Sequence, residues 1–327
     1  MESSRAVSRR ARRSHRPLLS LALASVVVIG ATAAGTVYVK AQAHSGGGAV
    51  SSAATPSASP PPATTTQEAA VAEPVVDFDE RLASAMKSVS VTGRAKVSVA
   101  VLDVDSGDSA VYGESVFDTA SIVKVDILAA LLLRHQEAGT SLSPGEKAYA
   151  TSMIENSDNA SASALWDAIG KAAGLDAANK TFGLTGTDGG DGALWGLTQT
   201  TAADQLTLLQ QVFGDDSALS RASRSYLQGL MGQIEADQRW GVSAAADGSG
   251  FALKNGWLPR STTGLWDVNS IGRVTVEGHA YLVAVLSNGN STQAEGISLV
   301  EAAAKAAVSV FTDADADAGA SAAAVSR

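Results

Sequence analysis

Two groups of strand-like segments lie far apart in this chain, and a long helical pattern separates them. In the first group, hydrophobic alternation over 95–104 is followed by the turn Ser106-Gly107 and a short return strand at 110–112. The second group contains three strand-like runs, at 251–257, 265–276 and 281–286. Helical spacing flanks the two groups, at 76–91 and 293–311. The chain therefore reads as helix, two strands, helical block, three strands and helix.

Strands from both ends of such a sequence most simply share one sheet. This order predicts an α+β fold: a five-stranded antiparallel sheet flanked by terminal helices, with an inserted all-helical domain at about 119–246. Helical patterns over 120–173 and 201–213 and a glycine-rich loop at 183–196 make up most of that insertion. A two-lobe arrangement of this kind leaves a cleft between the lobes.

Composition divides the rest of the chain. Residues 1–43 hold a cluster of arginines, an uncharged and mostly apolar run from Pro17 to Val39, and the small-residue site Ala41-Gln42-Ala43. This pattern predicts a signal peptide or a signal anchor, with an exported, extracellular or cell-surface body. Residues 44–76 are rich in proline and glycine and predict a disordered linker. Residues 77–311 form the expected folded domain, and 312–327 are predicted to be a disordered tail.

Charge and cysteine content exclude several classes of protein. The formal net charge is −9, which argues against nucleic-acid binding. There is no cysteine, so disulfides, thiolate metal sites and lipid attachment through an N-terminal cysteine are excluded. Only His135 and His279 fall in the folded part, and no metal-ligand spacing surrounds them. We therefore expect no cofactor and no metal, and membrane contact only through the N-terminal segment of a monomer.

A lysine in an apolar segment is the first candidate functional residue. Lys124 and Asp126 are the only charged residues between Ala120 and Leu133, so the predicted helix is buried on most sides. Three-residue spacing places Ser121 and Lys124 on one helical face. A partly desolvated lysine loses basicity and can accept a serine proton. On its own, Ser-x-x-Lys is a common pattern, and Lys124 could equally extend to the surface.

Two further motifs have ordinary readings when taken singly. Ser157-Asp158-Asn159 fits a helix N-terminus with a serine or aspartate cap. Lys254-Asn255-Gly256 fits a strand end, where glycine would also let a substrate lie along the strand.

Together and in this order, the three motifs resemble the signature of class A β-lactamases and penicillin-binding proteins. The resemblance covers roughly residues 77–311 and implies the fold described above. It also implies that Ser121 attacks a β-lactam or acyl-D-alanine carbonyl and that Lys124 activates it. Ser157 would pass a proton to the leaving nitrogen, and the substrate would be held by four further residues: Asn159, Lys254, Asn255 and Gly256. Backbone N–H groups of Ser121 and Trp257 would form the oxyanion hole, and Arg260 or Arg273 is a further candidate for the substrate carboxylate.

Three departures from this signature affect the expected activity. No Glu occurs between Glu155 and Glu235, so the family's deacylating glutamate is missing; Asp188, Asp191 and Gln199 lie in this region without a recognisable motif. Asn255 replaces the usual threonine. The short Ser121–Ser157 separation suggests that one cleft wall is absent.

We therefore predict an exported serine hydrolase that is acylated by β-lactam or D-alanyl-type amide substrates and deacylates slowly. Three alternatives stay open at this point: a true β-lactamase with another water-activating group, a D-Ala-D-Ala cell-wall peptidase, and a non-catalytic peptidoglycan or ligand-binding module. A Ser-His-Asp hydrolase is disfavoured because no Gly-x-Ser-x-Gly elbow occurs.

Overall fold

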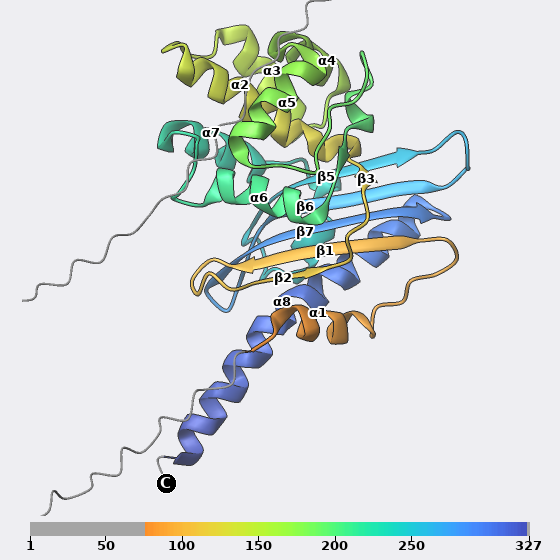
Figure 1. Cartoon of the computed structure of the whole chain (residues 1–327), viewed down its shortest axis with the longest axis vertical. Coiled ribbons are helices and arrows are strands. Elements are labelled where there is room, and N and C mark those ends of the chain that lie inside the picture. Colours follow the sequence, from red (N-terminus) through yellow and green to blue (C-terminus); the bar gives the residue numbers. More distant parts are fainter. Residues whose placement is uncertain (1–75, 326–327) are drawn as a thin grey trace, which may run out of the picture. The chain divides into compact units, whose positions relative to one another are not determined.

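A single five-stranded antiparallel sheet organises the folded domain. The computed structural model describes the backbone of residues 76–325 and the side chains of residues 76–312. The predicted signal segment 1–43 and all of the predicted linker 44–76 except Val76 lie outside these residues. The strand order is β2-β1-β7-β6-β5, with every neighbouring pair antiparallel (Figure 1). The strands are β1 (Lys96–Asp103), β2 (Ser109–Tyr112), β5 (Phe251–Pro259), β6 (Trp266–Val276) and β7 (His279–Asn290). The predicted sheet, built from both ends of the sequence, is confirmed.

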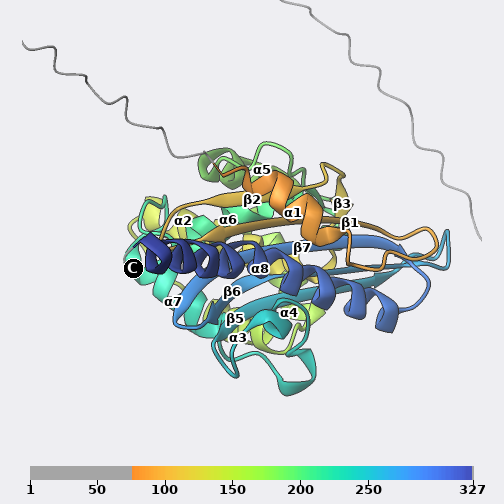
Figure 2. The same ribbon diagram turned by 90° about the horizontal axis from the view of Figure 1, so that it is seen from below.

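The central strand β7 divides the core into two layers because its side chains alternate between the faces. Leu282, Ala284 and Leu286 pack with the helical lobe, whereas Val283 and Val285 pack with the terminal helices. Those helices are α1 (Phe78–Met86) and α8 (Gln293–Val325), which lie together on one face of the sheet (Figure 2).

The helical lobe is inserted between β2 and β5 and covers the opposite face. It contains α2 (Val123–Glu137), α3 (Pro144–Glu155), α4 (Asn159–Ile169), α5 (Lys171–Phe182), α6 (Ala202–Phe213) and α7 (Arg221–Met231). The continuous helical pattern predicted over 120–173 is broken into four pieces. Left-handed Gly139 and Gly170 follow helices α2 and α4, where glycine adopts a positive φ at little cost. Thr201 is the N-cap of α6, and its side chain accepts from the Asp204 backbone N–H.

Short elements connect the lobe to the sheet and were not predicted. They include a two-stranded sheet of β3 (Phe117–Asp118) and β4 (Gln199–Thr200). They also include the 3₁₀ turns η1 (Ala120–Ile122), η2 (Trp195–Leu197), η3 (Ala236–Gln238) and η4 (Gly241–Ala245).

The last helix corrects one prediction. We expected a disordered tail after Phe311, but α8 continues to Val325. The segment 313–325 is rich in alanine, the strongest helix former, whereas the sequence interpretation relied on its repeated aspartates. Within residues 76–325, no helix combines the length and the apolar character needed to cross a bilayer.

Candidate active site

The candidate nucleophile sits in a tightly held turn where β3 leads into α2. Ser121 is the middle residue of η1, and the residue before it, Ala120, has a φ of 48°. A left-handed conformation is unfavourable for alanine, so the surrounding structure must impose it. Asn269, buried on β6, does so in part: its Nδ2 donates to the Thr119 carbonyl at 3.0 Å. This role of Asn269 could not be predicted from sequence, because the residue lies on a strand that is distant from Ser121 along the chain.

Lys124 occupies the first turn of α2 directly behind Ser121. Its Nζ donates to Ser121 Oγ at 2.9 Å, to Ser157 Oγ at 3.0 Å, to the Ser157 carbonyl at 2.8 Å and to Asn159 Oδ1 at 2.9 Å. The side chain is fully buried. Burial lowers the pKa of Lys124 from its ordinary value of 10.5 to about 7, with Asp158 opposing the change. A large share of Lys124 is therefore neutral near pH 7 and able to accept a proton.

The second motif approaches Lys124 from the start of α4. Ser157 has a φ of 57°, a strained conformation that directs both its hydroxyl and its carbonyl at the lysine. Asp158 is the N-cap of α4 and accepts from the Ser161 backbone N–H at 2.7 Å. The ordinary capping role thus belongs to Asp158, while Ser157 and Asn159 face the site.

The third motif lies on β5, the edge strand nearest the helical lobe. Lys254 Nζ donates to Ser157 Oγ at 3.0 Å and to the carbonyl of Asn255 at 3.0 Å. Lys254 is fully buried, and burial, with a smaller contribution from the positive charge of Lys124, holds its pKa well below the ordinary range. The Ser157 hydroxyl therefore bridges the two lysines, and the three motifs meet as predicted.

Gly256 is required by the close approach of β5 to the nucleophile turn. A Cβ on this residue would lie 2.7 Å from the Ser121 backbone nitrogen and 2.8 Å from the Thr119 carbonyl oxygen. Only glycine permits that contact. Trp257, the next residue, lines the same cavity as Ser121. The oxyanion hole from the N–H groups of Ser121 and Trp257 stays a prediction.

Asn255 does not take the place in the substrate site that we expected. Its side chain is 1% exposed, and its Nδ2 donates to the carbonyls of Gln238 and Trp240 at 2.7 and 2.9 Å. Side chains alternate along a strand, so Lys254 and Gly256 face the nucleophile while Asn255 faces the other way. Asn255 anchors the segment that carries η3 and is absent from the cavity lining.

A cavity of about 620 Å³ opens above Ser121. One side is formed by 193–197, the other by 257–262, and the floor by four residues: Ala120, Ser121, Asn159 and Ser163. No residue between Ile122 and Asp158 is part of this lining. Among the described side chains, no aspartate or glutamate lines the cavity. Asp188, Asp191 and Gln199, the sequence candidates near the missing glutamate, are all outside it.

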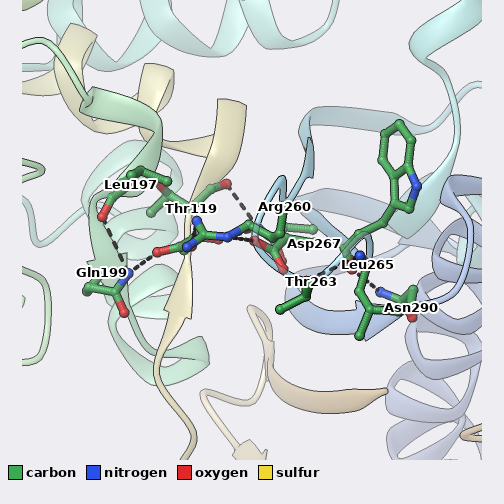
Figure 3. Close-up of polar contacts among 11 residues, drawn as sticks. Thr119, Leu197, Gln199, Arg260, Thr263, Leu265, Asp267 and Asn290 are labelled. Carbon is green, nitrogen blue, oxygen red and sulfur yellow. Dashed lines mark hydrogen bonds and ion pairs between the residues drawn. The ribbon is translucent and has the colours of Figure 1, made fainter. Parts of the chain in front are cut away.

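Arg260 belongs to an ion-pair cluster, and Figure 3 shows it with Asp267 and Gln199. Arg260, which lines the cavity, pairs with Asp118 and lies 3.9 Å from Asp267, while Gln199 donates to Asp118. Burial, with repulsion from Asp118, raises the pKa of Asp267 to about 6. The Arg260 guanidinium thus joins the end of β5 to Asp118 on β3, and Asp118 is three residues before Ser121. Arg273, the other candidate, is exposed on β6 and does not reach the cavity. No group of described side chains has an arrangement suited to a metal ion.

Comparison with known proteins supports the same family as the motifs. Putative lipoprotein LppW of Mycobacterium tuberculosis and of Mycobacterium bovis is 27% identical over 200 residues, covering 58% of this chain and 63% of the relative. The chain thus spans less than two thirds of these relatives.

Solved structures share the fold at low sequence identity. PBP-A superposes with a TM-score of 0.61 at 22% identity, covering 72% of this chain and 96% of PBP-A. A beta lactamase from Xanthomonas campestris superposes with a TM-score of 0.55 at 21% identity, covering 70% of this chain and 95% of that one. The model of the Beta-lactamase enzyme family matches residues 146–311, from α3 to the buried part of α8. With this match over half of its length, the chain belongs to the beta-lactamase enzyme family.

Proposed function

We propose that this protein is a serine hydrolase that is acylated on Ser121 by β-lactam or D-alanyl-type amide substrates. The observation that supports this most directly is the continuous set of contacts from Ser121 Oγ through Lys124 Nζ and Ser157 Oγ to Lys254 Nζ, each between 2.9 and 3.0 Å. Such a set connects a nucleophile to a base and to a proton donor for the leaving group.

The proposed acylation takes one proton from Ser121 and delivers one proton to the leaving nitrogen. Neutral Lys124 accepts the proton of Ser121 Oγ as that oxygen bonds to the substrate carbonyl carbon. The bond from that carbon to the leaving nitrogen then breaks, and the nitrogen receives the Ser157 proton, which Lys124 replaces. Lys254 Nζ donates to Ser157 Oγ and so stabilises the negative charge that develops on that oxygen during the transfer. We also assign Lys254 to binding the substrate carboxylate.

Slow deacylation is the second part of the proposal. Hydrolysis of an acyl-enzyme needs a base that activates water, and no carboxylate of the described residues lines the cavity. One solved relative in fold, a mutant of PBP-A, is an acyl-enzyme complex with penicillin G. We propose that this chain forms a comparable adduct with a long lifetime, which favours a penicillin-binding or peptidase role over efficient penicillin hydrolysis.

We also propose that the protein is exported. The basic and apolar segment 1–43 supports export, and the relatives named putative lipoproteins point to the cell surface. The sequence contains no cysteine, the residue that carries the lipid of a lipoprotein.

Intact-mass spectrometry after incubation with penicillin G tests the proposal. We expect a mass increase of one penicillin on the wild type and on Ser106→Ala, a turn residue outside the cavity, and none on Ser121→Ala. Addition to Ser121→Ala would reject Ser121 as the nucleophile. Reversible binding without a mass increase would instead favour a non-catalytic ligand-binding module, and fast turnover a true β-lactamase. Release of D-alanine from a stem peptide would identify the peptidase alternative.

A further inference from the structure

Trp195 lies over Lys124, the proposed catalytic base of the candidate active site. The centre of its ring lies 5.0 Å from Lys124 Nζ, and the residue also lines the cavity above Ser121. Its Nε1 donates to Ser163 Oγ on α4 at 3.1 Å, which fixes the ring across the gap between the loop and the helix. In the sequence, Trp195 falls within the predicted glycine-rich loop 183–196 and carries no motif of its own.

The loop that carries Trp195 is itself held at several points. The Gly189 N–H donates to Asp176 Oδ1 at 2.8 Å, and the Gly190 N–H donates to Thr198 Oγ1 at 3.1 Å. Trp166, buried on α4, donates from Nε1 to the Gly192 carbonyl at 2.8 Å. These contacts tie the first part of the segment 189–198 to helices α5 and α4, and tie the start of the segment to its end. The position of the indole ring is therefore set by the fold.

Lys124 has no surface left for a water molecule. The neutral amine that could accept a proton from water has two protons and one lone pair, and four oxygens already lie within 3.0 Å of this nitrogen. The aromatic face occupies a further direction, and the lysine is fully buried. Trp195 lies over this nitrogen and also lines the cavity, so removal of the ring would open a path for water from the cavity to Lys124.

We propose that Trp195 is a positioning residue that separates Lys124 from water, so that an acyl group on Ser121 persists. The inference rests on the proposed acylation of Ser121. In the reaction that is blocked, a water oxygen would bond to the ester carbonyl carbon as its proton moves to neutral Lys124. The bond from that carbon to Ser121 Oγ would then break, and Ser121 would take the proton back from Lys124. Acylation does not need this water, because there the proton comes from Ser121 itself.

A simpler role for Trp195 is wall packing. A large aromatic side chain in a loop often only fills space, and such a residue would affect stability and substrate affinity alone. The two roles differ in what they predict for the adduct. Wall packing leaves the rate of ester hydrolysis unchanged once the adduct has formed, whereas exclusion of water controls that rate.

The test is the lifetime of the penicillin G adduct, followed by intact mass after removal of free penicillin. We expect Trp195→Ala to shorten the lifetime by about a hundredfold, the scale of general-base catalysis. Trp195→Phe, which keeps an aromatic face, should stay within about threefold of the wild type. Tyr149→Ala, which removes an exposed aromatic residue on α3 outside the cavity, is the matched control and should not differ. Deacylation of Trp195→Ala should also rise with pH through the titration of Lys124, which loss of packing alone would not produce.

The outcomes separate the two proposals. An equal lifetime for Trp195→Ala and wild type, with adducts on both, overturns the role of Trp195 and leaves acylation of Ser121 intact. Absence of any adduct on the wild type overturns the proposed function and this inference together. If Trp195→Ala does not fold, Trp195→Leu serves in its place, because leucine keeps apolar volume but covers less of the lysine; an unchanged lifetime there also overturns the inference.

Discussion

Replacing Gly256 with alanine should damage acylation far more than it damages the fold. The new Cβ would lie 2.7 Å from the Ser121 nitrogen, 2.8 Å from the Thr119 oxygen and 2.9 Å from the Ile122 nitrogen, all backbone atoms that cannot rotate away. Ordinary contacts begin at 3.4 Å, so η1 and β5 must separate by about 0.7 Å. Overpacking of this kind costs about 1–3 kcal/mol of folding free energy. A displacement approaching 1 Å of a reacting atom costs about a hundredfold in rate.

The assay is the second-order rate of labelling by a fluorescent penicillin, with thermal unfolding measured in parallel. Gly229→Ala is the matched control: this glycine lies inside α7, and a Cβ there would meet no atom within 4 Å. We expect that control to label at the wild-type rate and to gain about 0.5–1 kcal/mol from helix propensity. A Gly256→Ala protein that labels as fast as wild type would show that β5 and the nucleophile turn are not in rigid contact, and would refute this account of the site.

Three further changes test the electrostatics and anchoring of the site. Labelling needs neutral Lys124, so the labelling rate should rise about tenfold per pH unit up to pH about 7 and then level off. The variant Lys124→Arg, which stays charged, should label about a hundredfold more slowly or worse. A flat pH profile of the wild type would exclude Lys124 as the base. The pKa of Asp267 is raised from 3.8 to about 6 in the folded protein, so ionisation of this residue weakens the fold as the pH rises from about 4 to 6. Asp267→Asn should therefore raise the Tm relative to wild type at pH 7 but not at pH 3.5. Equal shifts in Tm at both pH values would contradict the raised pKa. Asn255→Thr restores the usual residue of the motif but leaves the buried carbonyls of Gln238 and Trp240 without a donor. The free energy of unfolding, measured by chemical denaturation, should fall by about 1–3 kcal/mol, and labelling should be no faster than in the wild type. Faster labelling would place residue 255 in the substrate site.

The candidate site was predicted well wherever a motif combined local spacing with an unusual residue. Lys124 was recognisable because a charge in an otherwise apolar helix needs a reason, and the structure places it 2.9 Å from Ser121. Asn255 was misassigned because a motif gives residue order but not which face of the strand each side chain occupies. Its buried donors to the η3 segment became visible only with the register of β5 in place.

Asn269 and Trp195 could not have been found from sequence, and Arg260 was a candidate only for the substrate carboxylate, not for its ion pair with Asp118. Asn269, Trp195 and Arg260 come from a strand, a loop and a strand end that have no local pattern of catalysis. Each contributes by reaching a residue distant in sequence: Asn269 the turn before Ser121, Trp195 the Lys124 amine, and Arg260 the Asp118 carboxylate.

The amino-acid sequence by itself determined the layers of this protein. Hydrophobic alternation at both ends of the domain fixed the strands and their buried faces, because side chains in a strand repeat every two residues. An apolar helix with a single lysine identified the centre of the lobe. Only the tertiary structure decided which side chains meet around that lysine, where the backbone must be glycine and where an indole ring lies over the amine. Those contacts join segments far apart in the chain, and distance along a sequence carries no information about distance in space.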